Sequence, residues 1–210
     1  MSSEAIQNGH IVLAIESAIR GGSISLIAEE REIDNWIGST DVSKAEDLLV
    51  DIDAMLDRNT ISIRDINHVA VSAGPGSFTG IRIGIATALG LKTGLGIPMS
   101  SVSALSAMAE ASMYDGQGVI AVPVGRNAIC VQTFSEDKIA IDEPRSVSIE
   151  EFGDKIPVGV NLILHGSLFQ QFGHLGKATD FGENIAFTIG VSCIKTPGVV
   201  NAPLFISKIF

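Results

Sequence analysis

One segment of the sequence has the composition of an anion-binding loop. Residues 74–80 read Gly-Pro-Gly-Ser-Phe-Thr-Gly and lie between an apolar run, typical of a buried strand, and a predicted helix. This arrangement presents backbone N–H groups to a phosphate or carboxylate. A P-loop is excluded, because Leu91 precedes Lys92 where a glycine is required. A nucleophile elbow is excluded, because Pro75 and Thr79 stand where it requires glycine.

Other catalytic patterns are matched less well. A dinucleotide fingerprint requires glycine at Thr79, and an acid after the next strand, where this sequence has serines. The four histidines show no metal-ligand spacing, and no Ser/His/Asp set can be assembled from the sequence. We therefore expect no catalytic residue and no metal site in this chain.

Two charged residues outside the loop could contact an anion. Glu16 ends the first predicted strand, just before the turn at Gly21 and Gly22. In a phosphotransferase such an acid could hold a metal-bound phosphate, and a solvated strand end is the alternative interpretation. Arg126 lies in a predicted turn, where it is either an anion contact or an exposed arginine.

Apolar periodicity predicts an α/β chain. In the first half, strands are predicted at residues 11–15, 23–28, 32–37, 68–72 and 97–102, with helices at 43–58, 79–95 and 103–111. In the second half, strands are predicted at 119–124, 128–134 and 162–165, with a helix beginning at 166. We predict two subdomains, residues 1–112 and a smaller unit of residues 113–210, whose apolar tail packs back on the body.

The helix predicted at 79–95 carries an unusual set of small residues. They recur at every fourth position: Gly76, Gly80, Gly84 and Ala88. Each glycine costs a helix about 1 kcal/mol relative to alanine, so a close approach of another backbone must offset them. This helix is apolar on nearly all sides, and therefore it is either a core helix of this chain or a helix shared with a partner.

Composition restricts the possible partners. The chain has 210 residues, 46% of them hydrophobic, and a formal net charge of −10. An acidic surface disfavours direct binding to nucleic acid and to anionic membranes. No signal peptide or membrane span is predicted, so we expect a soluble cytoplasmic protein. Cys130 and Cys193 are predicted to be buried free thiols.

Residues 69–88 resemble the TsaB (YeaZ) family through the run Gly-Pro-Gly-Ser-Phe-Thr-Gly-x-Arg-x-Gly. The first strand, Val-Leu-Ala-Ile-Glu-Ser at residues 12–17, is similar to the family's opening, and residues 97–105 also fit. The resemblance covers about residues 11–112. It implies an actin-like ATPase (ASKHA, ribonuclease H-like) fold of two subdomains, each with a strand meander and flanking helices.

The resemblance also implies a function. TsaB-family proteins are non-catalytic subunits that bind and stabilise TsaD, which acts with the ATPase TsaE. The complex adds threonylcarbamoyl to adenosine 37 of tRNAs that read codons beginning with A. The resemblance thus implies no cofactor on this chain, with ATP and Mg²⁺ used by the partner complex. It implies only indirect contact with tRNA, and a homodimer where TsaD is absent.

Three rival interpretations remain open from the sequence. The first is a small-molecule kinase or nucleotide hydrolase of the same fold that uses Glu16. The second is a glycoprotease, the label attached to this superfamily. A glycoprotease requires a nucleophile or metal ligands, and the sequence shows neither. The third is a dimeric structural protein with no role in tRNA modification.

The resemblance assigns the partner interface to the helices at 43–58 and 79–95. The predicted partner-binding residues are Leu48, Leu49, Ile52, Leu56, Gly80, Ile81, Gly84, Ile85, Ala88 and Leu89. The substitution Gly84→Leu is accordingly predicted to abolish pairing. Glu16, Ser17 and Arg126 would be the vestige of a nucleotide site, because the family usually has aspartate at the position of Glu16 and an Asp-x-Arg element ending at Arg126. Lys44 and Ala45 also depart from the family's His-Ser-Glu.

Overall fold

The protein is described by a computed structural model that covers residues 9–39, 47–157 and 159–200. Its first half contains β1 (Ile11–Glu16), β2 (Ser23–Ala28), β3 (Arg31–Ile37), α2 (Leu48–Arg58), the 3-10 turn η2 (Ile63–Asp65), β4 (Ile66–Ser72), α3 (Phe78–Leu95), β5 (Met99–Val102) and α4 (Ala104–Ala111). Its second half contains β6 (Gly118–Val124), β7 (Ala128–Phe134), β8 (Arg145–Ser148), α5 (Phe152–Lys155), β9 (Asn161–His165), α6 (Gly166–Phe172), β10 (Lys177–Gly182) and α7 (Ile185–Lys195).

The two halves repeat one topology. The first five-stranded sheet has the order β3-β2-β1-β4-β5, and the second has the same order when read as β8-β7-β6-β9-β10. In each sheet three strands form an antiparallel meander, and two parallel strands follow through helical crossovers. The predicted pair of strand meanders with flanking helices is therefore confirmed.

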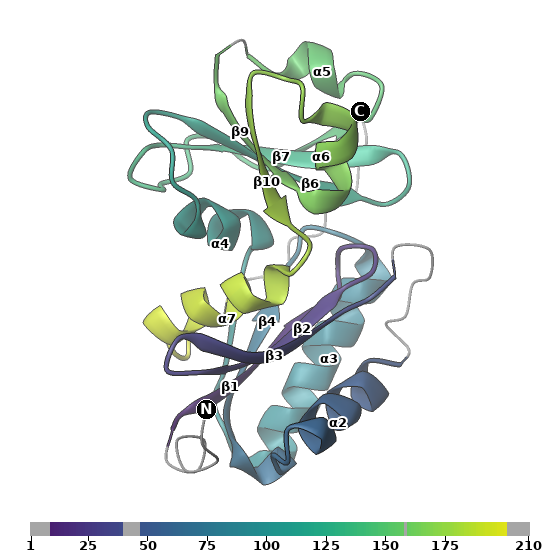
Figure 1. Ribbon diagram of the computed structural model, residues 1–210, viewed down its shortest axis with the longest axis vertical. Coiled ribbons are helices and arrows are strands. Elements are labelled where there is room, and N and C mark those ends of the chain that lie inside the picture. The colour runs from purple at the N-terminus through teal and green to yellow at the C-terminus, as the bar shows by residue number, and fades with distance from the viewer. Residues whose placement is uncertain (1–8, 40–46, 158, 201–210) are drawn as a thin grey trace.

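Five layers stack along the long axis of the molecule (Figure 1). Helices α2 and α3 cover the outer face of the first sheet, and α5 and α6 cover the outer face of the second. Helices α4 and α7 lie between the two sheets. The side chains of β1 divide accordingly, because successive residues of a strand point to opposite faces: Val12 faces α7, and Leu13 faces the outer helices.

The last helix of each half packs on the sheet of the other half. Helix α4 follows β5 but contacts β6 and β7, whereas α7 follows β10 but packs on β1, β2 and β4. Gly190 permits the close packing of α7, because a Cβ at this position would collide with Ile27. The division into residues 1–112 and 113–210 stays a prediction, and these two exchanged helices join its two parts into one core.

Most predicted elements of the first half are present within one or two residues of their expected ends. Helix α2 is described only from Leu48, so the start predicted at residue 43 lies outside the described residues, as does the tail 201–210. The elements β8, α5, β10 and α7 were not predicted from the sequence. Cys130 and Cys193 are buried free thiols, as predicted.

Candidate functional site

The glycine loop is tied to the connection between β1 and β2. It links β4 to α3, and Ser77 caps the helix by accepting a hydrogen bond from the Gly80 N–H at 3.3 Å. The Ser77 N–H donates to the Ala18 carbonyl at 2.7 Å, and the Ser17 hydroxyl donates to the Gly80 carbonyl at 2.9 Å. The backbone N–H groups of Ser77 and Gly80, the Gly80 carbonyl and the Ser77 hydroxyl are thus bonded within the chain.

The small-residue stripe serves this same contact. A Cβ at Gly76 would collide with the Ala18 carbonyl, and one at Gly80 would collide with the Ser17 carbonyl. At Gly84 a Cβ would collide with the Ser17 hydroxyl oxygen. The three glycines of the stripe thus pack closely against the chain's own β1–β2 connection, and this contact accounts for them without a second subunit.

Most of the predicted partner-binding residues are buried inside the chain. Those with at most 4% exposure, or classed as buried glycines, are Leu48, Ile52, Leu56, Gly80, Ile81, Gly84 and Ala88. They form the face of α2 and α3 that packs on the first sheet, so the sequence pattern located the core face of these helices. For these seven residues the structure corrects the expected exposure to a partner.

Apolar side chains do reach the outer surface of the same two helices. Leu49 and Leu89, both predicted partner-binding residues, are 60% and 46% exposed, and Ile85 is half-buried. The prediction missed Val50, which is 66% exposed, and Phe78, which is 50% exposed. The signal was available, since Leu49 and Val50 fall outside the apolar row that α2 turns to the sheet.

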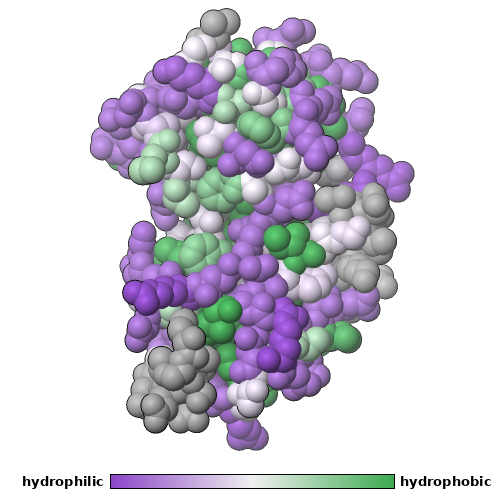
Figure 2. All heavy atoms as spheres, viewed as in Figure 1, coloured by the Kyte–Doolittle hydropathy of each residue, from purple (hydrophilic) through white to green (hydrophobic). Residues whose placement is uncertain are grey.

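Phe78 begins α3 and carries a cation on its ring. The Arg82 guanidinium carbon lies 3.7 Å from the centroid of the Phe78 ring, one helical turn along. Figure 2 shows one side of the molecule as mainly hydrophilic, with hydrophobic side chains at separate places in both halves. We name the side chains of Leu49, Val50, Phe78, Ile85 and Leu89 the outer apolar surface.

Glu16 is turned into the protein. Its side chain is 2% exposed, and its Oε1 accepts hydrogen bonds from the backbone N–H groups of Ala18 and Ile19, at 2.7 and 2.9 Å. Burial raises the pKa of the Glu16 carboxyl to about 7, and the two N–H donors oppose that rise. The carboxyl group therefore holds the β1–β2 connection, against which Gly76 and Gly80 pack. The alternative of a solvated strand end is wrong, because the Glu16 side chain is buried.

The three residues predicted as a vestigial nucleotide site occupy different surroundings. Glu16 and Ser17 are engaged within the loop that follows β1. Arg126 is exposed in the turn between β6 and β7, in the other half of the chain. Among the described residues, the hydrogen bonds of Glu16 and Ser17 go to the β1–β2 connection and to α3, and none of them reaches Arg126.

Neither a metal cluster nor a membrane-spanning helix is found in the described part of the chain. Across residues 9–39, 47–157 and 159–200, no three His, Cys, Asp or Glu side chains are grouped so that they could hold a metal ion. Within the same ranges no helix has both the length and the apolar character that a membrane crossing requires.

Solved structures share this fold. YeaZ from Pseudomonas aeruginosa superposes with a TM-score of 0.66 at 16% identity, over 89% of this chain and 92% of that one. A Bacteroides thetaiotaomicron protein described as having an actin-like ATPase fold and unknown function superposes with a TM-score of 0.53 at 12% identity, over 92% and 99% of the two chains. These similarities confirm the predicted actin-like fold.

Sequence comparison gives the family. The TsaB protein of Buchnera aphidicola (subspecies Baizongia pistaciae) is 37% identical over 100 residues, which are 47% of this chain and 45% of that protein. The chain aligns with about half the length of such curated relatives. Residues 42–157, more than half of the chain, match the family model described as TsaD: tRNA N6-adenosine threonylcarbamoyltransferase. The chain therefore belongs to the tRNA N6-adenosine threonylcarbamoyltransferase family, and its similarity within that family is to the members named TsaB or YeaZ.

Proposed function

We propose that this chain is a non-catalytic subunit in the biosynthesis of threonylcarbamoyladenosine in tRNA, and that it binds and stabilises a TsaD-type catalytic subunit. Relatives named as TsaB threonylcarbamoyladenosine biosynthesis proteins support the pathway. The match to a model of the TsaD family supports a partner of related fold, because related subunits commonly pair through related surfaces.

The observation that carries the proposal is the outer apolar surface. Its most exposed members, Leu49, Val50, Phe78 and Leu89, lie on α2 and α3, which cover the same sheet. Large exposed apolar side chains are a feature of protein interaction sites, and an interface of standard size buries roughly 1,600 Å² in total. Arg82 beside Phe78 adds a cation of the kind enriched at such interfaces.

The proposal includes that this chain catalyses no reaction itself. Its support is the β1–β2 connection, where the polar groups of Glu16 and Ser17 are bonded to backbone partners within the chain. A phosphate that approached this loop would compete with those bonds. ATP and Mg²⁺ then belong to the partner complex with TsaE, and the net charge of −10 favours indirect contact with tRNA.

The test is reconstitution with TsaD from the same genome. We expect the two proteins to co-purify, and we expect Val50→Asp combined with Leu89→Asp to abolish the complex and the threonylcarbamoyl transfer that depends on it. Ile139→Asp is the matched control, because Ile139 is 66% exposed but lies in the second half. Gly84→Leu is unsuitable, because its side chain would collide with Ser17 inside the chain.

Two results would contradict the proposal. The first is failure of the wild-type chain to bind TsaD under every nucleotide condition. The second is saturable binding of Mg-ATP by the isolated chain with hydrolysis that Glu16→Gln abolishes, which would instead support the kinase or nucleotide hydrolase alternative.

A further inference from the structure

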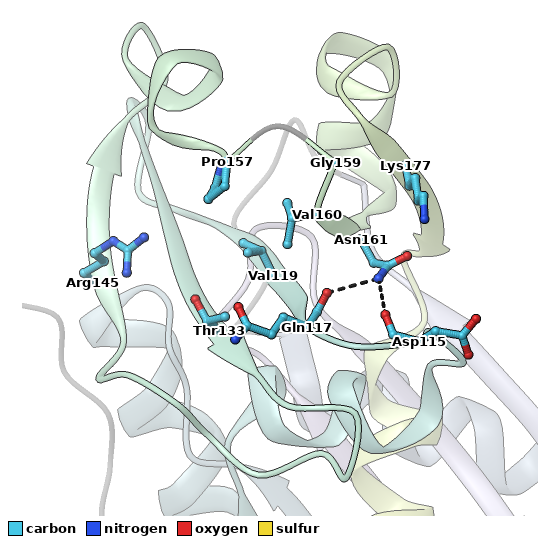
Figure 3. Close-up of a pocket in the computed structure, with 10 residues that line it drawn as sticks. All are labelled: Asp115, Gln117, Val119, Thr133, Arg145, Pro157, Gly159, Val160, Asn161 and Lys177. Carbon is cyan, nitrogen blue, oxygen red and sulfur yellow. Dashed lines mark hydrogen bonds between the residues drawn. The ribbon is translucent and has the colours of Figure 1, made fainter.

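A cavity of about 390 Å³ opens on the outer side of the second sheet (Figure 3). It lies at the ends where β6, β9 and β10 begin and β7 finishes. The residues that line it are Asp115, Gln117, Val119, Thr133, Arg145, Pro157, Gly159, Val160, Asn161 and Lys177. It is separate from the outer apolar surface, which belongs to the first half.

The length of one helix explains why this space is open. In the first half, the crossover helix α3 has 18 residues and is about 27 Å long, enough to follow neighbouring strands from end to end. Its counterpart α6 has 7 residues and is about 10 Å long, whereas a strand of 7 residues such as β6 extends about 23 Å. Helix α6 begins where β9 ends, so it stops before the opposite end of the sheet.

The floor of the cavity is apolar and held in place. Val119, Pro157 and Val160 contribute apolar side chains. The Asn161 Nδ2 donates to the Asp115 carbonyl at 2.7 Å and to the Gln117 carbonyl at 3.1 Å, which joins the start of β9 to the segment before β6. The Asn161 amide oxygen makes no hydrogen bond with a described residue.

Two cations stand on opposite walls. Arg145 comes from β8 and Lys177 from β10, the two edge strands of the sheet, and Figure 3 shows the Arg145 guanidinium turned toward the cavity. Asp142 holds Arg145 by one contact of 2.6 Å and also accepts hydrogen bonds from the Thr133 N–H and hydroxyl. Lys177 makes no ion pair with any described residue.

Two carboxylates lie near the cavity, and neither is directed into it. Asp142 pairs with Arg145 and is outside the lining. The Asp115 carboxylate points away from the centre of the cavity in Figure 3. A ligand in the cavity would therefore meet the Arg145 guanidinium and the apolar floor, and no carboxylate turned toward it.

We propose that this cavity binds a small molecule that carries a single oxyanion, carboxylate or phosphate, on an apolar body. The free N–H groups of Arg145 would bind the oxyanion, and Val119 and Val160 would pack against the apolar part. Lys177, on the opposite wall, would add to the attraction without contacting the same oxyanion. The volume lies within the range of small-molecule sites, which is roughly 300–1,000 Å³. This site does not depend on the proposed binding of TsaD.

The experiment is an NMR titration of the full chain with benzoate and with phenyl phosphate, with benzyl alcohol as the neutral probe. We expect saturable shifts of the backbone amides of Val119, Asn161 and Lys177 with an anionic probe. We expect Arg145→Met to weaken this binding by about tenfold or more, since a charged hydrogen bond is lost. Lys92→Met removes an exposed lysine from α3 and should leave the affinity unchanged.

Each outcome decides the proposal. Saturation by benzoate in preference to phenyl phosphate identifies a carboxylate ligand, and the reverse preference identifies a phosphate. Equal affinity for benzyl alcohol, equal weakening by Lys92→Met, or absence of any localised shift at millimolar probe would overturn it. The fold of Arg145→Met is checked by circular dichroism, because this substitution also releases Asp142. Lys177→Met provides a second variant, which should weaken binding less than Arg145→Met does.

Discussion

The two halves of the molecule share a strand order and differ in the helices that cover it. In the first half, α2 and α3 have 11 and 18 residues and cover the outer face of their sheet. Their counterparts α5 and α6 have only 4 and 7 residues. The long helices expose apolar side chains, for which we propose a protein partner, and the short ones leave a cavity, for which we propose a small molecule.

This difference shows that a duplicated frame can be put to different uses by helix length alone. The order and pairing of the strands are the same in both halves, although the outer helices differ in length. What joins the halves is the middle layer, where α4 and α7 are exchanged between the sheets. Under the two proposals, the binding surfaces lie in the outer layers, and the middle layer belongs to a core that both halves share.

The largest effect is expected in the first half, at the contact between its helix and the β1–β2 connection. Gly80→Ala should destabilise the protein by more than about 3 kcal/mol, because its Cβ would collide with a backbone carbonyl that cannot turn away. Gly90 lies on the same helix, and a Cβ there would contact no other atom, so Gly90→Ala should stabilise the protein by up to about 1 kcal/mol. Urea unfolding measures both, and equal effects of the two substitutions would refute the close contact.

The next effect tests whether the halves share one core. Ile189 lies on α7 and is fully buried among residues from both sheets. Ile189→Ala should cost about 3 kcal/mol and lower the hydrogen-exchange protection of β1 and β6 together. Ile139→Ala, at an exposed site, should change stability by less than about 0.5 kcal/mol. Loss of protection in β1 alone would show that the halves unfold separately.

A smaller effect concerns the pH dependence contributed by Glu16. Its pKa is raised from 4.5 to about 7 in the folded protein, so between these pH values the folded state keeps a proton that the unfolded state releases. Stability therefore falls as pH rises through this window, by roughly 2 to 3 kcal/mol. Glu16→Gln keeps an acceptor for both N–H groups but has no carboxyl to ionise, so its stability should not show this fall.

The measurement is the unfolding free energy of wild type and Glu16→Gln, compared at each pH from about 5 to 8. His165 in the second half acts in the opposite direction, because burial lowers its pKa from 6.5 to about 4, and stability is lost as pH falls through that range. The comparison between the two proteins at equal pH cancels this contribution. Parallel curves would show that the Glu16 carboxyl is not held in its buried, protonated form.

The same contrast explains what could be predicted from the sequence. Strands that are buried on both faces, such as β1 and β7, appear as continuous apolar runs with clear ends, and β7 was predicted with its observed bounds. The strand β10 was missed because it is a largely exposed edge strand with charged residues. Helix α7 was missed because five of its eleven residues are β-branched, which favours a strand, and it shows no periodic polar face.

For the candidate site, the sequence identified the helices but not the direction in which their faces point. The stripe that contains Gly84 required a close contact, and only the tertiary structure shows that Ser17 of the same chain provides it. The cavity beside Lys177 could not be predicted either, because it depends on the length of α6 and on the meeting of two edge strands distant in the sequence.

The most direct test of the central claim is the affinity of this chain for TsaD from the same genome, measured by isothermal titration calorimetry. We expect Leu49→Asp and Leu89→Asp each to weaken binding by about tenfold or more, because each places a charge within a buried apolar interface. Ile139→Asp in the second half should bind as the wild type does. If Ile139→Asp weakened binding while Leu49→Asp and Leu89→Asp left it unchanged, the partner surface would lie in the second half, and the assignment of the interface to α2 and α3 would be contradicted.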